Sequence, residues 1–277
     1  MMPNTSDADK AFTGSIPQLY DTCLVPMIFA PYAADLARRL ASAPLPALSD
    51  VLEIAAGTGA ATRALAATLP GRVAIVATDL NQAMLDHAAA VGTKRPVAWQ
   101  QADAMRLPFA DQTFDAVVCQ FGAMFFPDKP VAFAEARRVL RPGGVFIFSV
   151  WDRIADNEFA DAVTTALEAV FPHDPPRFLA RTPHGYHEQR IIARDLADGG
   201  FASLPAIDTV AARSRAASPR IPALAYCQGT PLRNEIEARD ATRLEEATEA
   251  AAQAIAGRFG PGAVDGKIQA HVVTVRR

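Results

Sequence analysis

The chain has 277 residues, of which 50% are hydrophobic and 21% are charged, so it is long and apolar enough to fold around a buried core. Its 27 basic and 30 acidic side chains nearly cancel, which argues against nucleic acid or an anionic membrane surface as a partner. Three widely spaced cysteines (Cys23, Cys119 and Cys227) argue against a disulfide framework and against a thiolate metal site.

The chain begins with a polar stretch and then becomes helical. No apolar run has the length of a signal peptide or a membrane span, so we expect a cytoplasmic protein without membrane insertion. Apolar residues at helical spacing predict a helix over 33–41, which Pro44 and Pro46 end. We interpret residues 1–45 as an N-terminal helical lid segment.

Residues 46–152 alternate between short apolar runs and segments of helix length. Repeated strand–helix units of this kind imply parallel strands joined by right-handed crossovers. Most of the strands are continuously apolar, which is typical of a sheet that helices cover on both faces. The predicted elements are strands at 51–54, 73–78, 97–101, 114–120 and 145–151 and helices at 60–69, 82–91 and 129–140.

The pattern changes in residues 153–277. Helices are predicted at 157–170 and 188–198, and two late strands at 207–212 and 268–275. A helical stretch rich in Ala and Glu separates these strands, and we interpret residues 213–266 as an inserted cap. The whole chain is therefore predicted to adopt a doubly wound, Rossmann-like α/β fold, with a mostly parallel sheet of about seven strands, helices on both faces and a helical cap.

Two glycines follow the first predicted strand and precede a helix. At Gly57 and Gly59 the backbone can turn sharply and approach a ligand closely. Asp79, twenty residues after Gly59, ends the second strand, where its carboxylate can accept both hydrogen bonds from a ribose diol. Ligands of open parallel sheets bind beyond the carboxyl ends of the strands, so this pattern predicts a nucleoside site; a tight turn and a surface aspartate are the alternative.

The residues around the glycines favour a cationic nucleoside over a dinucleotide. A dinucleotide fingerprint needs a third glycine where Thr62 stands, and it places a pyrophosphate at the helix N-terminus. Glu53, just before the turn, would repel a pyrophosphate but attract a cation. S-adenosylmethionine fits better, because it has a ribose, no phosphate, an ammonium group and a sulfonium.

Three further side chains suit the adenine of such a ligand. Asp103, after the third strand, can accept a hydrogen bond from the adenine amino group. Leu80 and Met84 can flank the purine ring, although Met84 can equally fill a gap in the core.

Motifs in residues 51–151 resemble those of the class I S-adenosylmethionine-dependent methyltransferases, and in particular the group resembling the ubiquinone/menaquinone-biosynthesis C-methyltransferases. The resemblance implies S-adenosylmethionine as cofactor, S-adenosylhomocysteine as product and no metal. The motifs that carry it are 51–59 (VLEIAAGTG), 78–84 (TDLNQAM), 102–104 (ADA), 107–109 (LPF), 114–117 (FDAV) and 140–144 (LRPGG).

The resemblance also implies roles for single residues. Glu53 would bind the methionyl end, Asp79 the ribose, and Asp103 with the backbone of Ala104 the adenine, while Gln120 would line the pocket beside the reacting methyl group. The chain departs from the family at one loop position, where Ala55 replaces the first glycine. Alanine is tolerated there if its φ is negative.

Methyl transfer from a sulfonium is an in-line displacement with a good leaving group, so alignment and desolvation supply most of the catalysis. A base is needed only if the acceptor loses a proton, and His187 is the candidate because it titrates near neutral pH. The spacing of His184 and His187 does not indicate a metal site. Candidates for lining the acceptor site, with core packing as the alternative, are Tyr20, Phe121, Phe125, His184 and Tyr186.

We therefore expect a methyltransferase that acts on a small, apolar or aromatic acceptor and works as a monomer or homodimer without a nucleic-acid partner. Two alternatives remain at this point. One is a non-catalytic S-adenosylmethionine-binding module, and the other is an NAD-dependent oxidoreductase on the same fold.

Overall fold

A computed structural model describes residues 16–45 and 47–277, so residues 1–15 of the predicted lid lie outside the described residues. The sheet has seven strands in the order β3-β2-β1-β4-β5-β7-β6. The four pairings that join β3, β2, β1, β4 and β5 are parallel, which confirms the doubly wound, mostly parallel sheet. The strands are β1 (Asp50–Glu53), β2 (Ala74–Asp79), β3 (Ala98–Gln101), β4 (Phe114–Gln120), β5 (Leu140–Trp151), β6 (Ala206–Ala216) and β7 (Val264–Arg276).

Every predicted helix is present within a few residues of its expected ends. The helices are α2 (Ile16–Leu19), η1 (Tyr20–Phe29), α3 (Ala30–Ala41), α4 (Ala60–Thr68), α5 (Gln82–Val91), η2 (Ala123–Phe125), α6 (Lys129–Val139), η3 (Ile154–Asp156), α7 (Glu158–Val170), α8 (Phe178–Arg181), α9 (Gln189–Asp198), α10 (Arg220–Gln228), α11 (Leu232–Asp240), η4 (Ala241–Arg243) and α12 (Leu244–Phe259).

Two compact units divide the chain. The first, here called the sheet unit, comprises Ala30–Val150, His187–Val210 and Ala270–Arg277. The second, the helical unit, has as its described part residues 16–29, Trp151–Tyr186 and Ala211–Gln269. The strands β6 and β7 contribute residues to both units, and α10, α11 and α12 follow β6 and precede β7 in the chain. The predicted division into lid, core and capped C-terminal part stays a prediction.

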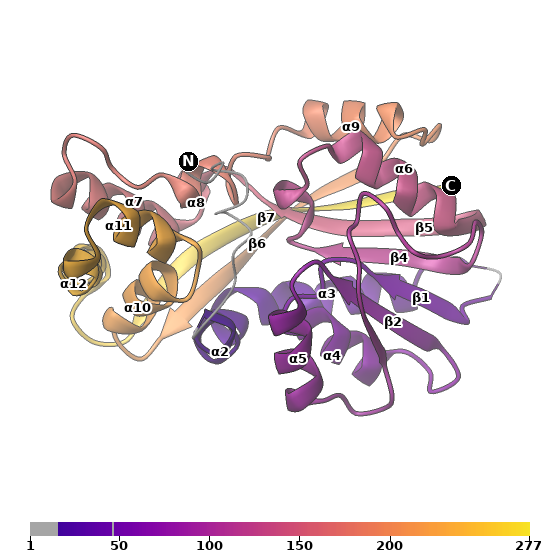
Figure 1. The fold of residues 1–277 in the computed structure, drawn as a ribbon, viewed down its shortest axis with the longest axis horizontal. Coiled ribbons are helices and arrows are strands. Elements are labelled where there is room, and N and C mark those ends of the chain that lie inside the picture. Colours follow the sequence, from indigo (N-terminus) through magenta and orange to yellow (C-terminus); the bar gives the residue numbers. More distant parts are fainter. Residues whose placement is uncertain (1–15, 46) are drawn as a thin grey trace. The chain divides into compact units, whose positions relative to one another are not determined.

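In the sheet unit, helices cover both faces of the sheet: α3, α4 and α5 lie on one face and α6 and α9 on the other (Figure 1). On the first face, every second residue of a strand is apolar and packs against α3 and α4, as Val51, Ile75 and Val118 do. On the second face, Phe146 and Phe148 of β5 contact Phe133 of α6 at ring-centroid distances of 5.7 and 5.3 Å. The two-residue period of the strands thus builds two apolar layers on one sheet.

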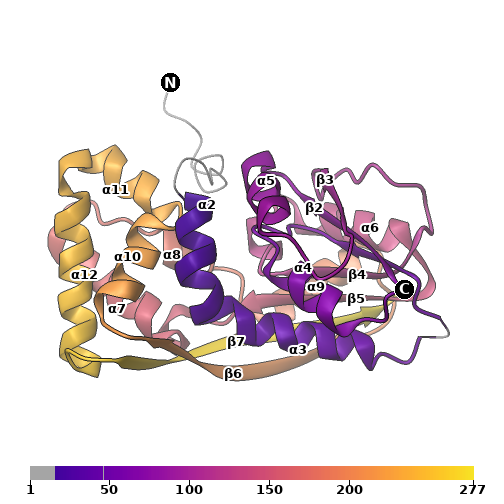
Figure 2. The same ribbon diagram turned by 90° about the horizontal axis from the view of Figure 1, so that it is seen from below.

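The helical unit is held together mainly by helix packing. Helix α12 packs against both α7 and α10, and these helices lie side by side (Figure 2). The segment η1 is a π-helix with Pro26 inside it, and it contacts α10. Periodicity did not predict η1, because a proline within a helical segment removes a backbone donor and argues against a regular helix. None of the helices among the described residues is long and apolar enough to span a membrane.

Strand β5 is longer than the sequence predicts. The tract 141–144 (RPGG), which lies between the predicted helix 129–140 and the predicted strand 145–151, belongs to β5, which begins at Leu140. Leu140 pairs with Phe114 of β4, and the register shifts before Ala116 pairs with Val145. Pro142 and Gly143 are therefore accommodated at an irregularity of the pairing, where a ladder hydrogen bond is not required.

Candidate functional site

The strand register brings the predicted cofactor-binding residues to one edge of the sheet. Glu53, the last residue of β1, is level with Ala77 of β2 and Val118 of β4. Asp79 and Gln120 therefore extend two residues beyond Glu53 on either side. Asp79 is in turn level with Gln101 of β3, so Asp103 follows two residues later. All of these side chains lie at the carboxyl end of the parallel strands, where ligands of such sheets bind.

The loop between β1 and α4 has left-handed backbone at three alternate positions. The φ angles are +57° at Gly57 and +85° at Gly59. A Cβ at Gly59 would lie 3.0 Å from the Trp99 ring and 3.2 Å from Cβ of Ala88, so this glycine permits close packing as well as the turn. At Ala55 φ is +55°, so the condition stated for an alanine at this position, a negative φ, is not met. A left-handed alanine costs about 1–2 kcal/mol, so the loop holds Ala55 in place against a local preference.

The carboxyl group of Glu53 is buried on one face of the sheet. It lies on the same face of β1 as Val51, which packs under α3 and α4, and only 1% of its surface is exposed. Its Oε2 accepts a 2.6 Å hydrogen bond from the hydroxyl group of Thr62. Burial raises the pKa of Glu53 to about 8, and the nearby Asp79 adds to this increase. A buried acid with this pKa favours a cation as its partner.

The carboxylate of Asp79 shapes the loop that carries the glycines. Its Oδ2 accepts a hydrogen bond from the Gly57 N–H group and its Oδ1 one from the Asn81 N–H group, both at 2.8 Å. Burial raises the pKa of Asp79, and these two backbone donors oppose the increase. Each carboxylate oxygen has two acceptor sites, so Asp79 can hold the loop and still accept hydrogen bonds from a diol.

The predicted adenine end is more open. Asp103 is exposed, and its Oδ1 accepts a 2.9 Å hydrogen bond from the Met105 N–H group, which closes a local turn. Ala104 lies within that turn and is half-buried. Leu80 is 45% exposed, so its side chain is accessible to an adenine ring. Met84 is buried and therefore also packs in the core.

Beyond β4 the chain turns sharply beside the loop. Gln120 is level with Ser149 of β5, and the next residue, Phe121, has a φ of +53°. The Phe121 ring packs edge-on against Tyr32 at 5.3 Å, so at least part of it belongs to the core. Phe125, in η2, is half-buried.

The remaining acceptor candidates belong to both units. Tyr20, His184 and Tyr186 are in the helical unit, whereas Phe121, Phe125 and His187 are in the sheet unit. Within the helical unit an aromatic row has ring-centroid distances of 4.8, 5.9 and 6.0 Å between successive members. Its members are Tyr20, Phe29, Trp151 and His184.

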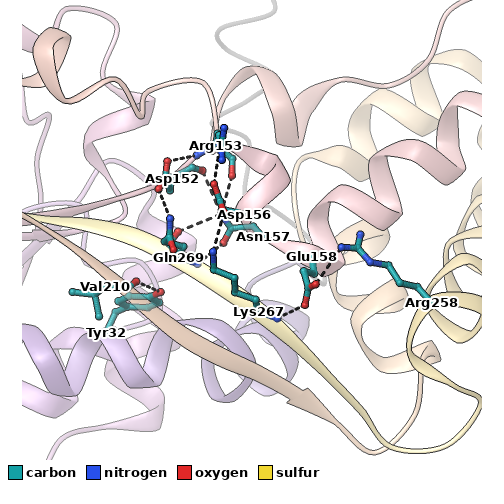
Figure 3. Close-up of polar contacts among 10 residues, drawn as sticks. All are labelled: Tyr32, Asp152, Arg153, Asp156, Asn157, Glu158, Val210, Arg258, Lys267 and Gln269. Atoms are coloured by element: carbon teal, nitrogen blue, oxygen red, sulfur yellow. Dashed lines mark hydrogen bonds and ion pairs between the residues drawn. The ribbon is translucent and has the colours of Figure 1, made fainter.

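The two histidines differ in how they are held. Nδ1 of the buried His184 donates a 2.8 Å hydrogen bond to the Asp152 carbonyl oxygen. Asp152 is itself held by Gln269 and Arg153 in a network that also includes Asn157 (Figure 3). His187 precedes α9, is 29% exposed at its side chain and has Nε2 3.5 Å from a carboxyl oxygen of Glu188. The His184 ring is thus held by a hydrogen bond to the backbone.

Two residues of the site were not identified by the sequence. Thr62 drew notice only as a missing glycine, yet its hydroxyl group holds Glu53. A Cβ at Gly122 would lie 2.3 Å from Cβ of Ala55, so this glycine makes the room that the alanine occupies. The spacing of Glu53 and Thr62 across a strand–turn–helix unit is a sequence signal that could have identified Thr62. The role of Gly122 is visible only in the folded loop.

The residues fit a cationic nucleoside. Two buried carboxyl groups are hydrogen-bonded by neutral donors, a hydroxyl group for Glu53 and backbone N–H groups for Asp79. Buried carboxylates gain most from a positively charged partner. Between the two glycines, Oγ1 of Thr58 is buried without a hydrogen-bond partner among the described residues, which is rare unless a ligand or water supplies one.

Comparisons with known proteins agree with this geometry. The family described as a methyltransferase domain matches residues 52–148. The ubiquinone/menaquinone biosynthesis C-methyltransferase of Teredinibacter turnerae is 31% identical over 165 residues, which are 55% of this chain and 66% of that protein. The demethylmenaquinone methyltransferase of Mycobacterium sp. (strain KMS) is 31% identical over 163 residues, 56% of this chain and 68% of that protein. The chain therefore spans about two thirds of the length of these relatives.

Among solved structures, the Haemonchus contortus phosphoethanolamine N-methyltransferase 2, in complex with phosphomonomethylethanolamine and S-adenosylhomocysteine, superposes with a TM-score of 0.58. It is 16% identical, and the match covers 99% of this chain and 60% of that one, so it shows a shared fold. From the matching domain, the relatives and the sheet topology together, the chain belongs to the class I S-adenosylmethionine-dependent methyltransferases and resembles the ubiquinone/menaquinone-biosynthesis C-methyltransferases.

Proposed function

We propose that this protein transfers the methyl group of S-adenosylmethionine to a small, apolar or aromatic acceptor. The cofactor supplies a methyl group on a cationic sulfur, and S-adenosylhomocysteine is the product. The methyl–sulfur bond breaks as the methyl–acceptor bond forms, and the electron pair of the broken bond goes to sulfur. Charge moves from sulfur toward the acceptor, so an apolar pocket does not oppose the reaction and positioning supplies most of the rate.

The observation that carries this proposal is the pair of buried acids at the ends of β1 and β2. Glu53 and Asp79 are 1% and 8% exposed, and burial raises the pKa of both. In the proposed complex, Glu53 binds the ammonium group of the methionyl end and Asp79 the ribose diol. The left-handed backbone at Ala55 and Gly57, which are both half-buried, allows this part of the loop to approach the ligand closely.

The other cofactor contacts follow from their positions past the strands. We assign Asp103 and the backbone of Ala104 to the adenine amino group and ring, and Leu80 and Met84 to the faces of the purine. Gln120, at the end of β4, is assigned to the region of the reacting methyl group. The exposure of Leu80 and Asp103 in the described structure supports these assignments, because each can meet a ligand without a change in the core.

For the acceptor we retain Tyr20, Phe121, Phe125, His184 and Tyr186 as lining residues and His187 as a base for acceptors that lose a proton. Replacing His187 with Gln is expected to lower turnover while the dissociation constant of S-adenosylmethionine stays unchanged. Steady-state kinetics and calorimetry on the same preparation measure the two effects. Full turnover in the variant would remove His187 from the reaction.

The proposal is tested first by binding. Isothermal calorimetry should show saturable binding of S-adenosylhomocysteine and none of NADH. Asp79→Asn should weaken the binding by about 1–3 kcal/mol, the range for a hydrogen bond to a charged group. The matched control is Asp86→Asn, an exposed aspartate on α5, which should bind as the wild type does. Binding of NADH instead would point to an oxidoreductase.

A second measurement separates an enzyme from a binding module. Incubation with S-adenosylmethionine and a panel of quinol-like, phenolic and aliphatic acceptors should release S-adenosylhomocysteine with at least one of them. Cofactor binding with no release on any acceptor would favour the non-catalytic module.

A further inference from the structure

Thr62 occupies a position that separates two kinds of nucleotide site. It stands in the first turn of α4, where dinucleotide-binding loops carry their third glycine so that helix and strand can pack closely. Its side chain is completely buried, and its hydroxyl group donates to Oε2 of Glu53 at 2.6 Å. A glycine there would remove the hydroxyl donor and leave the Glu53 carboxyl group with only the backbone N–H group of residue 62.

We propose that the Thr62 hydroxyl group is a positioning group that orients the Glu53 carboxylate for the ammonium end of S-adenosylmethionine, and so favours a cationic nucleoside over a phosphorylated one. This inference rests on the proposed function. It assigns a role to Thr62, which acts through Glu53 and does not need to contact the cofactor.

The charge state of Glu53 depends on neighbours from α4, β2 and β4. Asp79 of β2 raises its pKa, whereas Arg63 of α4 lowers it. Cys119 of β4 also lies near, but burial raises the pKa of its thiol to about 12, which keeps it neutral. Burial is the largest influence and favours the protonated acid, while the Thr62 hydrogen bond lowers the pKa. Removing the hydroxyl group therefore shifts Glu53 further toward the protonated form.

The consequence for binding has a definite sign. Only the ionised carboxylate neutralises an ammonium group, so a Glu53 that holds its proton to higher pH binds the cofactor less well at neutral pH. The lost affinity should return as the pH rises past the titration of Glu53. The ammonium group of the ligand titrates as well, but identically for every variant of the protein, so differences between variants report on the protein alone.

The chain supplies a matched control in Thr78. It is also a buried threonine, and its hydroxyl group donates to Glu53, but to the backbone carbonyl oxygen, at 2.9 Å. Thr78→Val thus removes a hydroxyl group of the same kind from the same neighbourhood without touching the carboxyl group. A general loss of packing or hydrogen bonding would affect both positions alike.

The experiment measures the dissociation constant of S-adenosylmethionine by calorimetry from pH 6 to pH 9 for the wild type, Thr62→Val, Thr62→Ser and Thr78→Val. We expect Thr62→Val to bind about tenfold more weakly at pH 7, as for the loss of one hydrogen bond to a charged group, and to approach the wild type at pH 9. Thr62→Ser keeps the hydroxyl group and should show the wild-type pH dependence of the dissociation constant. Thr78→Val should not change that pH dependence. In a Glu53→Gln background, Thr62→Val should add no pH dependence.

Three results would overturn the inference. One is an equal loss of affinity for Thr62→Val at every pH, another is a shift of the profile by Thr78→Val, and the third is wild-type binding by Thr62→Val throughout. If Thr62→Val does not fold, Thr62→Ala removes the same hydroxyl group and is measured instead. If the wild-type protein does not bind S-adenosylmethionine, the proposed function is refuted, and this inference with it. If the wild type binds but Thr62→Val has the same pH dependence of the dissociation constant, only the inference is refuted.

Discussion

Glu53 shows how one residue can serve binding at the expense of stability. Because burial raises its pKa to about 8, the folded protein keeps a proton between about pH 4.5 and pH 8 that the unfolded chain releases. In that window the folded state binds more protons than the unfolded state, so the contribution of Glu53 to the free energy of unfolding falls as the pH rises. A residue selected for stability alone would not stand there.

Glu53→Gln should therefore flatten the pH dependence of stability in the absence of ligand. We expect the gain in free energy of unfolding of the variant over the wild type to be larger at pH 8.5 than at pH 5.5, by an amount on the order of a few kcal/mol. Urea denaturation at the two pH values measures the change. Glu249→Gln, an exposed glutamate of α12, is the control and should show no such trend. A parallel shift of the Glu53 variant at both pH values would contradict the prediction.

Ala55 and Gly122 form a second residue-scale feature. Ala55 has a left-handed backbone, and its Cβ occupies the space that a side chain at Gly122 would need. Ala55 thus fits the loop only because residue 122 is a glycine. Such a pair should respond to substitution non-additively.

Gly122→Ala should destabilise the protein by about 1–3 kcal/mol, because the new Cβ would lie 2.3 Å from Cβ of Ala55 and 2.9 Å from Sγ of Cys119. Adding Ala55→Gly should recover part of this loss, since it removes one of the two colliding groups and a left-handed alanine. Chemical denaturation of both single variants and the double variant measures the coupling. Strict additivity of the three free energies would show that the two positions do not interact.

At the scale of elements, the start of β1 is attached to β4 by Asp115. The carboxylate of Asp115 accepts hydrogen bonds from the N–H groups of Ser49 and Asp50, at 2.8 and 3.0 Å, and an Arg141 guanidinium nitrogen lies 2.7 Å from it. Burial alone would raise the pKa of Asp115, but these donors outweigh it and lower the pKa. The stabilisation is therefore present above the ordinary aspartate pKa and is lost as the pH falls below it.

We expect Asp115→Asn to destabilise the protein at pH 7 by about 1–3 kcal/mol and to have a smaller effect at pH 3, where the unfolded wild-type chain binds a proton at this aspartate more readily than the folded protein does. Thermal denaturation at both pH values follows the difference. Asp111→Asn, an exposed aspartate whose pairing with Arg138 is open to solvent, is a control with an effect below about 1 kcal/mol. An equal loss for Asp115→Asn at pH 3 and pH 7 would exclude the ionic contribution.

At the scale of the whole molecule, the proposed cofactor residues all come from the sheet unit, whereas the acceptor candidates come from both units. Ligand effects on the sheet unit can be measured with the intact protein.

S-adenosylhomocysteine should raise the midpoint of thermal unfolding. At a concentration 100 times its dissociation constant, the ligand increases the free energy of unfolding of the part that binds it by about 2.7 kcal/mol. The increase should grow with ligand concentration, and Asp79→Asn should require more ligand for the same increase. An unchanged midpoint at saturating ligand would contradict binding to the folded state.

Features that depend on local pattern could be predicted from the amino-acid sequence. Short, mostly continuous apolar runs predicted the strands, and helical spacing predicted α4, α5 and α6 close to their observed ends, because these patterns reflect which faces are buried. The position of Glu53, Asp79 and Asp103 just past consecutive parallel strands was predictable for the same reason. Their charge also led to the prediction of a cationic nucleoside as the ligand, and the assignment of these residues to it stays a prediction.

Tertiary structure decided what depends on contacts between distant residues. The backbone at Ala55 is left-handed because the loop is held by Asp79 and has room over Gly122, and neither cause can be read from the alanine itself. The hydrogen bond between Thr62 and Glu53, and the high pKa that burial gives this acid, arise only when helix α4 packs on β1. The π-helix η1 and the long β5 likewise depend on partners elsewhere in the fold, because local propensity at Pro26 and Pro142 opposes regular structure.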